Sequence, residues 1–254
     1  MKIISYNVNG IRAAIKKGLL DWLETASPDI LCLQETKAIK EQVNLDAIEE
    51  KGYHAYWNSA ERKGYSGVAI FTRKKPMHVE YDTGIESLDG EGRVMRVDFD
   101  DVSVISLYLP NGGGSIERLD YKMKFCYDFT QYIYDLQKTH SNLVVCGDYN
   151  ICHKPIDIHD PIRNANVSGF LPIEREWLTE YIEECKMIDS FRVFNQQPGQ
   201  YTWWSYRARS RERNKGWRLD YHMVTEKLRP NLKRCVHLTE VKHSDHCPIL
   251  LELE

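Results

Sequence analysis

The stretch VMRVDFDDVSVISLYL, residues 94–109, decides the fold class. It holds two apolar runs, 94–99 and 102–109, separated only by Asp100-Asp101, a spacing typical of an antiparallel hairpin. Further apolar runs rich in Val, Ile, Leu and Tyr are expected to be strands, at 2–8, 30–34, 67–72, 143–148, 219–224 and 247–253. Because a hairpin excludes a purely parallel sheet, the sequence predicts mixed sheets.

Two helical patterns lie between these strands. Ser115 follows Gly112-Gly113-Gly114 as a candidate N-cap, and the residues expected on one buried face are Leu119, Met123, Cys126 and Ile133. A second helix is predicted from Pro172, with a buried side formed by Trp177, Leu178, Tyr181 and Ile182. Mixed sheets with helices outside indicate an α/β four-layer sandwich of two packed sheets. With 254 residues and no linker, we expect one domain over residues 1–254.

Composition excludes several classes of protein. No stretch approaches the roughly 20 consecutive apolar residues of a membrane helix, and no signal-peptide pattern follows Met1, so we expect a cytoplasmic protein without a membrane partner. The seven cysteines are an odd set without C-x-x-C spacing, which argues against a disulfide framework and a zinc site. The absence of a Walker loop, a nucleophile elbow and a G-x-G-x-x-G segment excludes P-loop hydrolases, serine esterases and dehydrogenases.

Polar residues follow many of the predicted strands. They are Asn7 and Asn9, Gln34 and Glu35, Tyr108 and Asn111, residues 147–150, residues 218–220, and residues 244–246 before the last strand. Several strand ends rich in Asp, Glu, Asn and His predict one polar site at a common edge of the stacked sheets.

Glu35 ends an apolar run, where a buried carboxylate needs a cation or hydrogen bonds. A hard divalent ion such as Mg²⁺ fits, since it takes one or two carboxylates and completes its shell with water or phosphate oxygens. Glu35 with Asp245 or Asn9 would suffice. A salt bridge from Glu35 to Lys37 or Arg12 is an equally good reading of the residue alone.

Asp148 and Asn150 are separated by one residue, so on an extended segment both side chains would point to the same side. A carboxylate that accepts a proton from water, beside an amide that orients it, suits hydrolysis. Taken alone, however, Gly-Asp-Tyr-Asn at 147–150 is better explained as a turn.

His246 has an acidic neighbour, Asp245, but adjacent side chains diverge on a strand. Asp220 is therefore the predicted partner that fixes the tautomer of His246 and supports a positive ring near a developing phosphate charge. A structural role is the alternative for any single histidine.

Residues 201–206 are rich in aromatic side chains and directly precede a basic segment. Residues 207–218 hold six cationic side chains against Glu212 alone, a local charge of +5 in a chain whose net charge is -3. Cations that meet phosphates and flat rings that hold a sugar or base favour nucleic-acid binding. A core tryptophan cluster beside a solvated loop is the alternative, and it is preferred for Trp204.

Seven ordered blocks resemble the exonuclease III family of abasic-site DNA endonucleases, within the endonuclease/exonuclease/phosphatase superfamily. The blocks span the chain and cover residues 7–12, 33–37, 64–69, 108–111, 147–150, 216–221 and 244–246. The resemblance implies a four-layer sandwich that uses Mg²⁺, or Mn²⁺ as a substitute, to cleave the phosphodiester on the 5′ side of an abasic site. A 3′-hydroxyl would remain, and 3′ to 5′ exonuclease and 3′-end cleaning activities would accompany this incision.

The resemblance also implies roles for individual residues. The residues implied as catalytic are Asp148, Asn150, His246, Asp220, Tyr108, Asn7 and Asn111; those as substrate-binding are Trp203, Arg207, Trp217, Arg218 and Leu219; and those near the metal are Glu35, Asn9 and Asp245. The implied substrate is double-stranded DNA with abasic sites or blocked 3′ ends, bound by a monomer. The chain departs from some relatives at Asn9, where they carry Asp, and at Gly114, where they place an arginine against DNA.

Two rival functions remain at this stage. One is a phosphatase, deadenylase or nonspecific nuclease of the same superfamily, and the tryptophans with neighbouring arginines argue against it. The other is a DNA-binding module without catalysis, which the full set of acid-base residues disfavours.

Overall fold

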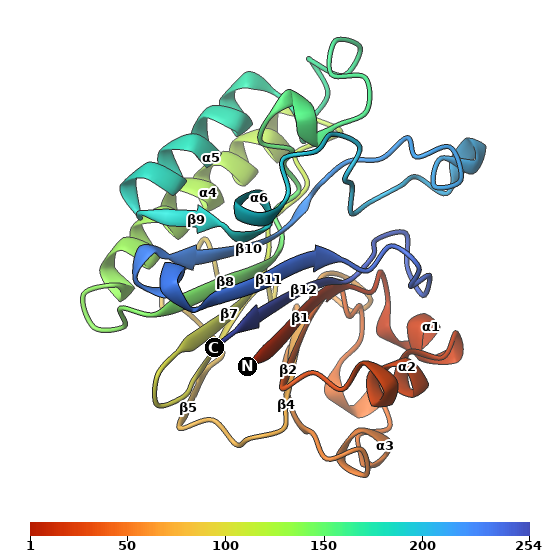
Figure 1. The fold of residues 1–254 in the computed structure, drawn as a ribbon, viewed down its shortest axis with the longest axis vertical. Coiled ribbons are helices and arrows are strands. Elements are labelled where there is room, and N and C mark those ends of the chain that lie inside the picture. Colours follow the sequence, from red (N-terminus) through yellow and green to blue (C-terminus); the bar gives the residue numbers. More distant parts are fainter.

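The chain forms two six-stranded sheets packed face to face, and the computed structural model describes all of residues 1–254 (Figure 1). The first sheet has the order β11-β12-β1-β2-β4-β3 and the second β5-β6-β7-β8-β10-β9. The strands are β1 (Lys2–Asn7), β2 (Ile30–Gln34), β3 (His54–Asn58), β4 (Val68–Thr72), β5 (His78–Glu80), β6 (Val94–Asp98), β7 (Ser103–Tyr108), β8 (Leu143–Asp148), β9 (Met187–Asp189), β10 (Asp220–Thr225), β11 (Leu232–His237) and β12 (Ile249–Leu253).

Helices cover the outer face of each sheet (Figure 1). They are α1 (Ile11–Lys16), α2 (Leu19–Ala26), α3 (Asp46–Glu49), α4 (Ile116–Leu136) and α5 (Pro172–Glu184). The short helix α6 (Ser190–Phe194) instead buries Phe191 between the sheets. Short 3-10 segments lie at Lys40–Gln42, Pro155–Asp157, Arg207–Arg209 and Glu226–Asn231. None of the helices is both long and apolar enough to span a membrane.

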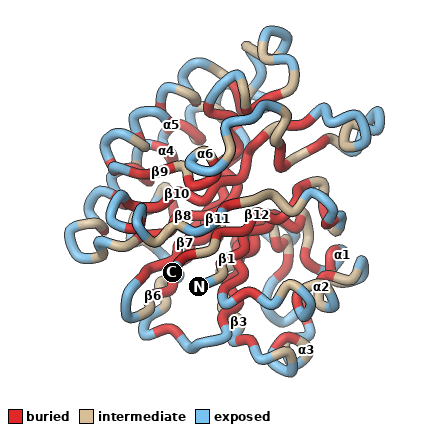
Figure 2. Tube along the Cα trace, viewed as in Figure 1, coloured by how far each residue is buried: buried red, intermediate tan, exposed pale blue.

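Three apolar clusters fill the spaces between these layers. Side chains of α4 and α5 pack on the second sheet, those of α1 and α2 pack on the first, and a third cluster lies between the sheets. The alternation along β2 shows why: Cys32 faces the other sheet, whereas Leu31 and Leu33 face the helices. The central strands are accordingly buried, whereas the edge strands are partly exposed (Figure 2). The predicted four-layer α/β sandwich is confirmed.

The hairpin that decided the fold class is present. β6 and β7 pair antiparallel, with Val94 opposite Leu107 and Asp98 opposite Ser103. The α4 helix begins as predicted, since the Ser115 side chain accepts a hydrogen bond from the Arg118 N–H, and α5 begins at Pro172. All seven cysteines are free and buried, as the sequence indicated.

The strand directions bring the polar strand ends to one edge. β1 runs parallel to β2, and β7 runs parallel to β8, while β10 and β12 are antiparallel to their neighbours β8 and β1. Consequently, the carboxyl ends of the four parallel strands and the starts of β10 and β12 share an edge. Close approach of β7 and β8 there requires Gly147, because a Cβ at this position would lie 1.8 Å from the Leu107 carbonyl oxygen.

Candidate active site

A cavity of about 410 Å³ opens at this shared edge of the two sheets. Its lining includes most of the residues predicted for the site, namely Asn9, Glu35, Tyr108, Asn111, Asp148, Asn150, Trp203, Trp217, Leu219, Asp245 and His246. Asn7 and Asp220 lie directly behind this lining and contact it through hydrogen bonds. The structure thus brings together segments that span the chain from residue 7 to residue 246.

Asn7 connects the two sheets at the centre of the site. Its fully buried amide nitrogen donates to Glu35 Oε1 at 3.0 Å and to Asp148 Oδ2 at 2.9 Å. Glu35 follows β2 of the first sheet, whereas Asp148 ends β8 of the second. One amide therefore sets the separation of two carboxylates that would otherwise repel each other.

Asp148 and Asn150 are joined by a turn, as Gly-Asp-Tyr-Asn taken alone indicated, and not by an extended segment; their side chains nevertheless lie close together. Asn150 has φ 50°, and its backbone N–H donates to Asp148 Oδ1 at 2.8 Å. The Asn150 amide nitrogen is held by the Leu109 carbonyl oxygen at 2.8 Å, and its Oδ1 lies 3.4 Å from Asn111 Nδ2. Burial raises the pKa of Asp148 to about 7, although His246 acts in the opposite direction.

His246 and Asp220 form the predicted carboxylate–imidazole pair. Nδ1 of His246 lies 2.8 Å from Asp220 Oδ2, and its Nε2 faces Asp148 Oδ2 at 3.8 Å. Burial alone would lower the pKa of His246, but Asp220, Asp148 and Asp245 together raise it to about 10. At neutral pH, the ring therefore carries a positive charge beside the cavity.

Oxygen atoms near Glu35 form a place for a cation. The Lys37 ammonium nitrogen lies 2.7 Å from Glu35 Oε2 and 2.5 Å from Asn9 Oδ1. The predicted salt bridge from Glu35 to Lys37 is therefore present. It does not exclude the metal site, because it lies in the same acidic cluster that suits a metal. Burial raises the pKa of Glu35, but the charge of Lys37 and the hydrogen bond from Asn7 lower it by more, so the carboxylate stays ionised.

Three acidic or imidazole side chains lie close enough to share one metal ion. Ligand atoms of Glu35, Asp148 and His246 lie within 4.8 Å of one another. The His246 ring is already held by Asp220, whereas the carboxylates and the Asn9 amide oxygen are the hard donors that Mg²⁺ prefers. These oxygen donors, two of which already contact the Lys37 ammonium, fit a hard divalent ion.

Asp245 points toward Asn9 and Trp203 rather than along the strand with His246. Its Oδ1 accepts from Asn9 Nδ2 at 2.9 Å, and its Oδ2 accepts from Trp203 Nε1 at 3.0 Å. The side chains of Asp245 and His246 thus diverge, as expected for sequence neighbours. The Asp245 carboxylate thus links Asn9 to the indole ring of Trp203.

The apolar wall consists of Trp203, Trp217 and Leu219. The two indole rings meet edge to face at 6.0 Å between centroids, with an interplanar angle of 89°. Trp204 instead lies buried beside Tyr201 and Cys247, which confirms the preference for a core role at that position.

The prediction that Arg218 contacts the substrate is wrong. Its guanidinium is buried, with Nε 2.8 Å from Asp157 Oδ1 and Nη2 2.7 Å from Asp189 Oδ2, so its charge does not reach the cavity. Arg211 is likewise occupied, since it donates to three carbonyl oxygens of residues 239–244. The basic segment therefore offers solvent fewer charges than its sequence indicated: the exposed cations are Arg207, Arg209, Arg213 and Lys215.

The Asp157 cluster predicts a pH dependence of stability. Burial opposes ionisation, but Arg218 and Arg192 lower the pKa of Asp157 to about 2, from an ordinary value of about 4. A lowered folded-state pKa stabilises the protein above the unfolded-state pKa, and this stabilisation is lost as the pH falls towards 2. In urea unfolding, the free-energy advantage of the wild type over Asp157→Asn is expected to be constant above about pH 5 and to shrink below about pH 4. A difference in the free energy of unfolding that is unchanged at pH 2.5 would contradict the lowered pKa of Asp157.

Sequence reasoning missed several contributors to the cavity. Lys37, Val167, Ser168 and Gly169 also line it, and the last three come from a loop without a regular pattern. Asn9, Glu35, Lys37 and Asn150 all have left-handed backbone angles, with φ between 45° and 51°. Such angles are uncommon for side-chain-bearing residues and cluster at functional sites, but nothing in the residue pattern at Glu35 or Lys37 indicates them.

Known proteins are similar to this chain in both sequence and architecture. The chain is 43% identical over 253 residues to an exodeoxyribonuclease of Bacillus subtilis, covering 99% of this chain and 98% of that protein. It is 41% identical over 256 residues to the DNA repair nuclease APEX1 of Danio rerio, covering 100% of this chain and 82% of the relative.

Solved structures agree with the sequence comparison. An AP endonuclease from Archaeoglobus fulgidus superimposes with a TM-score of 0.90 at 30% identity, over 100% of this chain and 99% of the other. A 3′ phosphatase from Neisseria bound to a product DNA hairpin gives a TM-score of 0.92 at 29% identity, over 100% of this chain and 99% of the other. The model of the endonuclease/exonuclease/phosphatase family matches residues 4–246, and the chain belongs to this family, as its sequence blocks predicted.

Proposed function

We propose that this chain is a Mg²⁺-dependent DNA repair nuclease that hydrolyses the phosphodiester 5′ to an abasic site and leaves a 3′-hydroxyl. The observation that carries the proposal is one cavity that combines a hydrolytic carboxylate, a charged imidazole, an oxygen-rich cation site and an indole wall. The relatives named for exodeoxyribonuclease and DNA repair nuclease activity support it. The same site would also remove nucleotides or blocking groups from 3′ ends, in a single-domain monomer that acts in the cytoplasm.

Asp148 is the proposed base that accepts a proton from the attacking water. The Asn150 N–H fixes one carboxylate oxygen and Asn7 fixes the other, so the carboxylate cannot rotate away from the cavity. Tyr108 is a poorer candidate, because burial and the Glu35 carboxylate raise its pKa well above the usual value and keep the phenol protonated at neutral pH. The proton transfer is therefore assigned to Asp148.

His246 is the proposed group that stabilises charge on the phosphate. An imidazolium held by Asp220 presents its Nε2–H beside Asp148, where negative charge would grow on the phosphoryl oxygens. Asn111 and Tyr108 line the same cavity and would hold the remaining oxygens. Glu35, Asn9 and Asp245 would hold Mg²⁺, which when bound polarises the phosphate and neutralises its charge.

The indole wall supports a substrate that lacks a base. Trp203, Trp217 and Leu219 present apolar surface next to His246 and Asp148, so a sugar turned out of the duplex would pack on the rings while its phosphate faces the charged residues. A lipid or inositol headgroup offers no flat apolar part to this wall.

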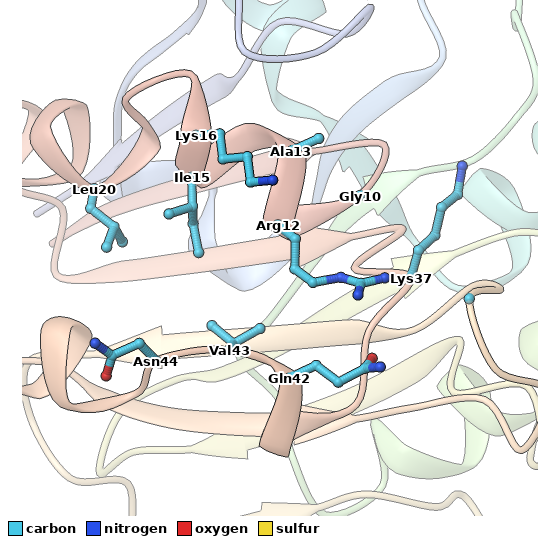
Figure 3. Close-up of a pocket in the computed structure, with 11 residues that line it drawn as sticks. Gly10, Arg12, Ala13, Ile15, Lys16, Leu20, Lys37, Gln42, Val43 and Asn44 are labelled. Atoms are coloured by element: carbon cyan, nitrogen blue, oxygen red, sulfur yellow. The ribbon is translucent and has the colours of Figure 1, made fainter.

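A second groove indicates where the DNA backbone would run. It measures about 700 Å³ and lies between α1 and the segment around Gln42, with Arg12 and Lys16 extending over it (Figure 3). Lys37 lines both this groove and the active-site cavity, so the two are adjacent. On the same edge of the molecule, the loop that carries Arg207 projects from the sheets (Figure 1).

Binding of intact duplex is expected to weaken steeply with salt, because these exposed cations would displace counterions from phosphates. Arg12→Ala with Lys16→Ala should lower the slope of log K against log salt by about 1 to 2, roughly one per lost phosphate contact. Fluorescence anisotropy with a labelled duplex measures the slope. Lys233→Ala, an exposed cation on β11 that lines neither cavity, is the matched control and should leave the slope unchanged. A flat salt titration of the wild type would remove the basic groove as a phosphate contact.

The proposed function is tested with a duplex that bears one synthetic abasic site. In Mg²⁺, we expect a nick on the 5′ side of the site with a 3′-hydroxyl end, and in EDTA we expect no product. Intact duplex, poly(A) and a phosphoinositide are assayed in parallel. Faster turnover of the phosphoinositide or of poly(A), or full incision in EDTA, would contradict the proposal.

A further inference from the structure

Lys122 of α4 and Glu174 of α5 form a buried ion pair beneath the active site. The ammonium nitrogen lies 2.6 Å from Glu174 Oε1, and both side chains are 0% exposed. A buried ion pair is weak evidence for stability, because desolvation offsets the attraction and apolar residues of the same size often serve as well. Stability alone therefore does not explain why this pair is buried between α4 and α5.

Apart from the bond by which Glu174 caps the N-terminus of α5 at Leu171, the remaining hydrogen bonds of this pair go to residues that line the cavity. Lys122 Nζ donates to the Asn150 carbonyl oxygen at 2.8 Å. Glu174 Oε2 accepts from the backbone N–H groups of Gly169 and Leu171 at 2.6 Å and 3.0 Å, and Oε1 accepts from the Ser168 hydroxyl at 3.1 Å. Thus one end of the pair holds the turn after Asp148, and the other holds the loop that lines the cavity.

Packing around the pair is too tight for these segments to shift independently. A Cβ at Gly169 would lie 3.0 Å from the Trp217 ring and 3.2 Å from the Asn150 carbonyl oxygen. A Cβ at Gly112, next to Asn111, would lie 3.0 Å from Lys122 Cδ and 2.9 Å from Ser168 Oγ. The Lys122 side chain therefore lies where the segments of Asn111, Asn150 and Ser168 meet.

We infer that Lys122 and Glu174 are positioning residues, which fix the Asp148–Asn150 turn relative to the indole wall that receives the sugar. Neither residue lines the cavity, so neither contacts substrate directly. Lys122 holds the Asn150 carbonyl oxygen, and Glu174 holds the Gly169 N–H. Together these two bonds set the distance between the hydrolytic carboxylate of Asp148 and the ring of Trp217. This inference rests on the proposed function, since it names residues that align the two parts of that site.

Apolar side chains of equal volume would fill the same space without this alignment. They would leave the Asn150 carbonyl oxygen and two backbone N–H groups without partners, and those groups would move toward water to recover hydrogen bonds. Displacement of a catalytic group by about 1 Å costs on the order of 10²-fold in rate, whereas binding through surface cations is unaffected.

The test is a pair of variants assayed on the abasic-site duplex in Mg²⁺. Lys122→Met with Glu174→Leu removes both charges and keeps the packing, and Glu174→Gln keeps the shape but removes one acceptor for the backbone. For the double variant, we expect kcat to fall roughly 10-fold to 10²-fold, while KM changes less than about 3-fold. Glu174→Gln should show a smaller fall in kcat, again without a rise in KM. Circular dichroism at the assay temperature establishes that each variant is folded.

A matched control separates alignment from stability. Phe129→Leu lies in the same α4–α5 interface, makes no contact with the cavity, and should lower Tm while kcat remains unchanged. Wild-type kcat in the folded double variant would overturn the inference. A fall in kcat of Phe129→Leu as large as that of the double variant would also overturn it. If the double variant does not fold, unchanged kcat in Glu174→Gln is decisive against it. Failure of the wild type to incise the duplex would instead contradict the proposed function itself.

Discussion

Asp148→Asn is expected to lower the single-turnover rate of incision by on the order of 10²-fold or more. The amide of the variant cannot accept the proton from water. Its N–H₂ group would also face the amide nitrogen of Asn7, which in the wild type donates to Asp148 Oδ2. The Asn150 N–H still finds a carbonyl acceptor at this position, so the turn is expected to persist. Single-turnover rates with saturating enzyme measure the chemical step without contributions from product release.

The control for this variant is a buried carboxylate elsewhere. Asp98→Asn on β6 removes an ion pair to Arg96 at 3.0 Å and lies outside the cavity. It should lower Tm and leave the rate of incision unchanged. A near wild-type rate for Asp148→Asn would remove Asp148 as the base and direct attention to a water held by Glu35 or to the hydroxyl of Tyr108.

His246→Ala is expected to have an effect of similar size, on the order of 10²-fold or more in the rate of incision. The variant removes the positive ring that faces Asp148 and leaves Asp220 buried without its partner. Asp220→Asn should cost less, because the ring remains in place while its charge is no longer supported. Substrate binding, measured by anisotropy in EDTA, is expected to change little, since the surface cations are intact.

His222→Gln is the matched histidine control. His222 is fully buried on β10, with Nε2 3.1 Å from the Ile249 carbonyl oxygen, and it does not line the cavity. Its replacement should affect Tm alone. If His246→Ala retained the wild-type rate while His222→Gln lost it, the assignment of the charged imidazole would be wrong.

Much of the fold was predictable because its strands carry strong local patterns. Central strands such as β2 and β8 are continuous apolar runs, and the two long helices have either an N-cap serine or a first-turn proline. The four edge strands β3, β5, β9 and β11 were missed. β5 and β9 have only three residues each, and pairing with a neighbour rather than local composition makes an edge segment a strand.

The site was predictable where side-chain chemistry and strand ends coincide, as at Asp148, Asp220 and His246. It was not predictable where distant packing decides the role of a residue. Arg218 reads as one more cation of a basic loop, yet Asp157 and Asp189 neutralise it in the interior. Lys122 reads as a solvent-facing helix residue, and only the position of Glu174 on the neighbouring helix shows that it is buried. The left-handed angle of Glu35 likewise depends on the loop that surrounds it.

The place of β12 in the first sheet governs when the protein can become active. β12 follows every other strand in the chain, yet it inserts between β1 and β11, and His246 lies just before it. A ribosome must therefore have made nearly all of these residues before the imidazole can meet Asp148. Nascent chains that already contain Glu35 and Asp148 but end before residue 246 would lack the imidazole that completes the cavity.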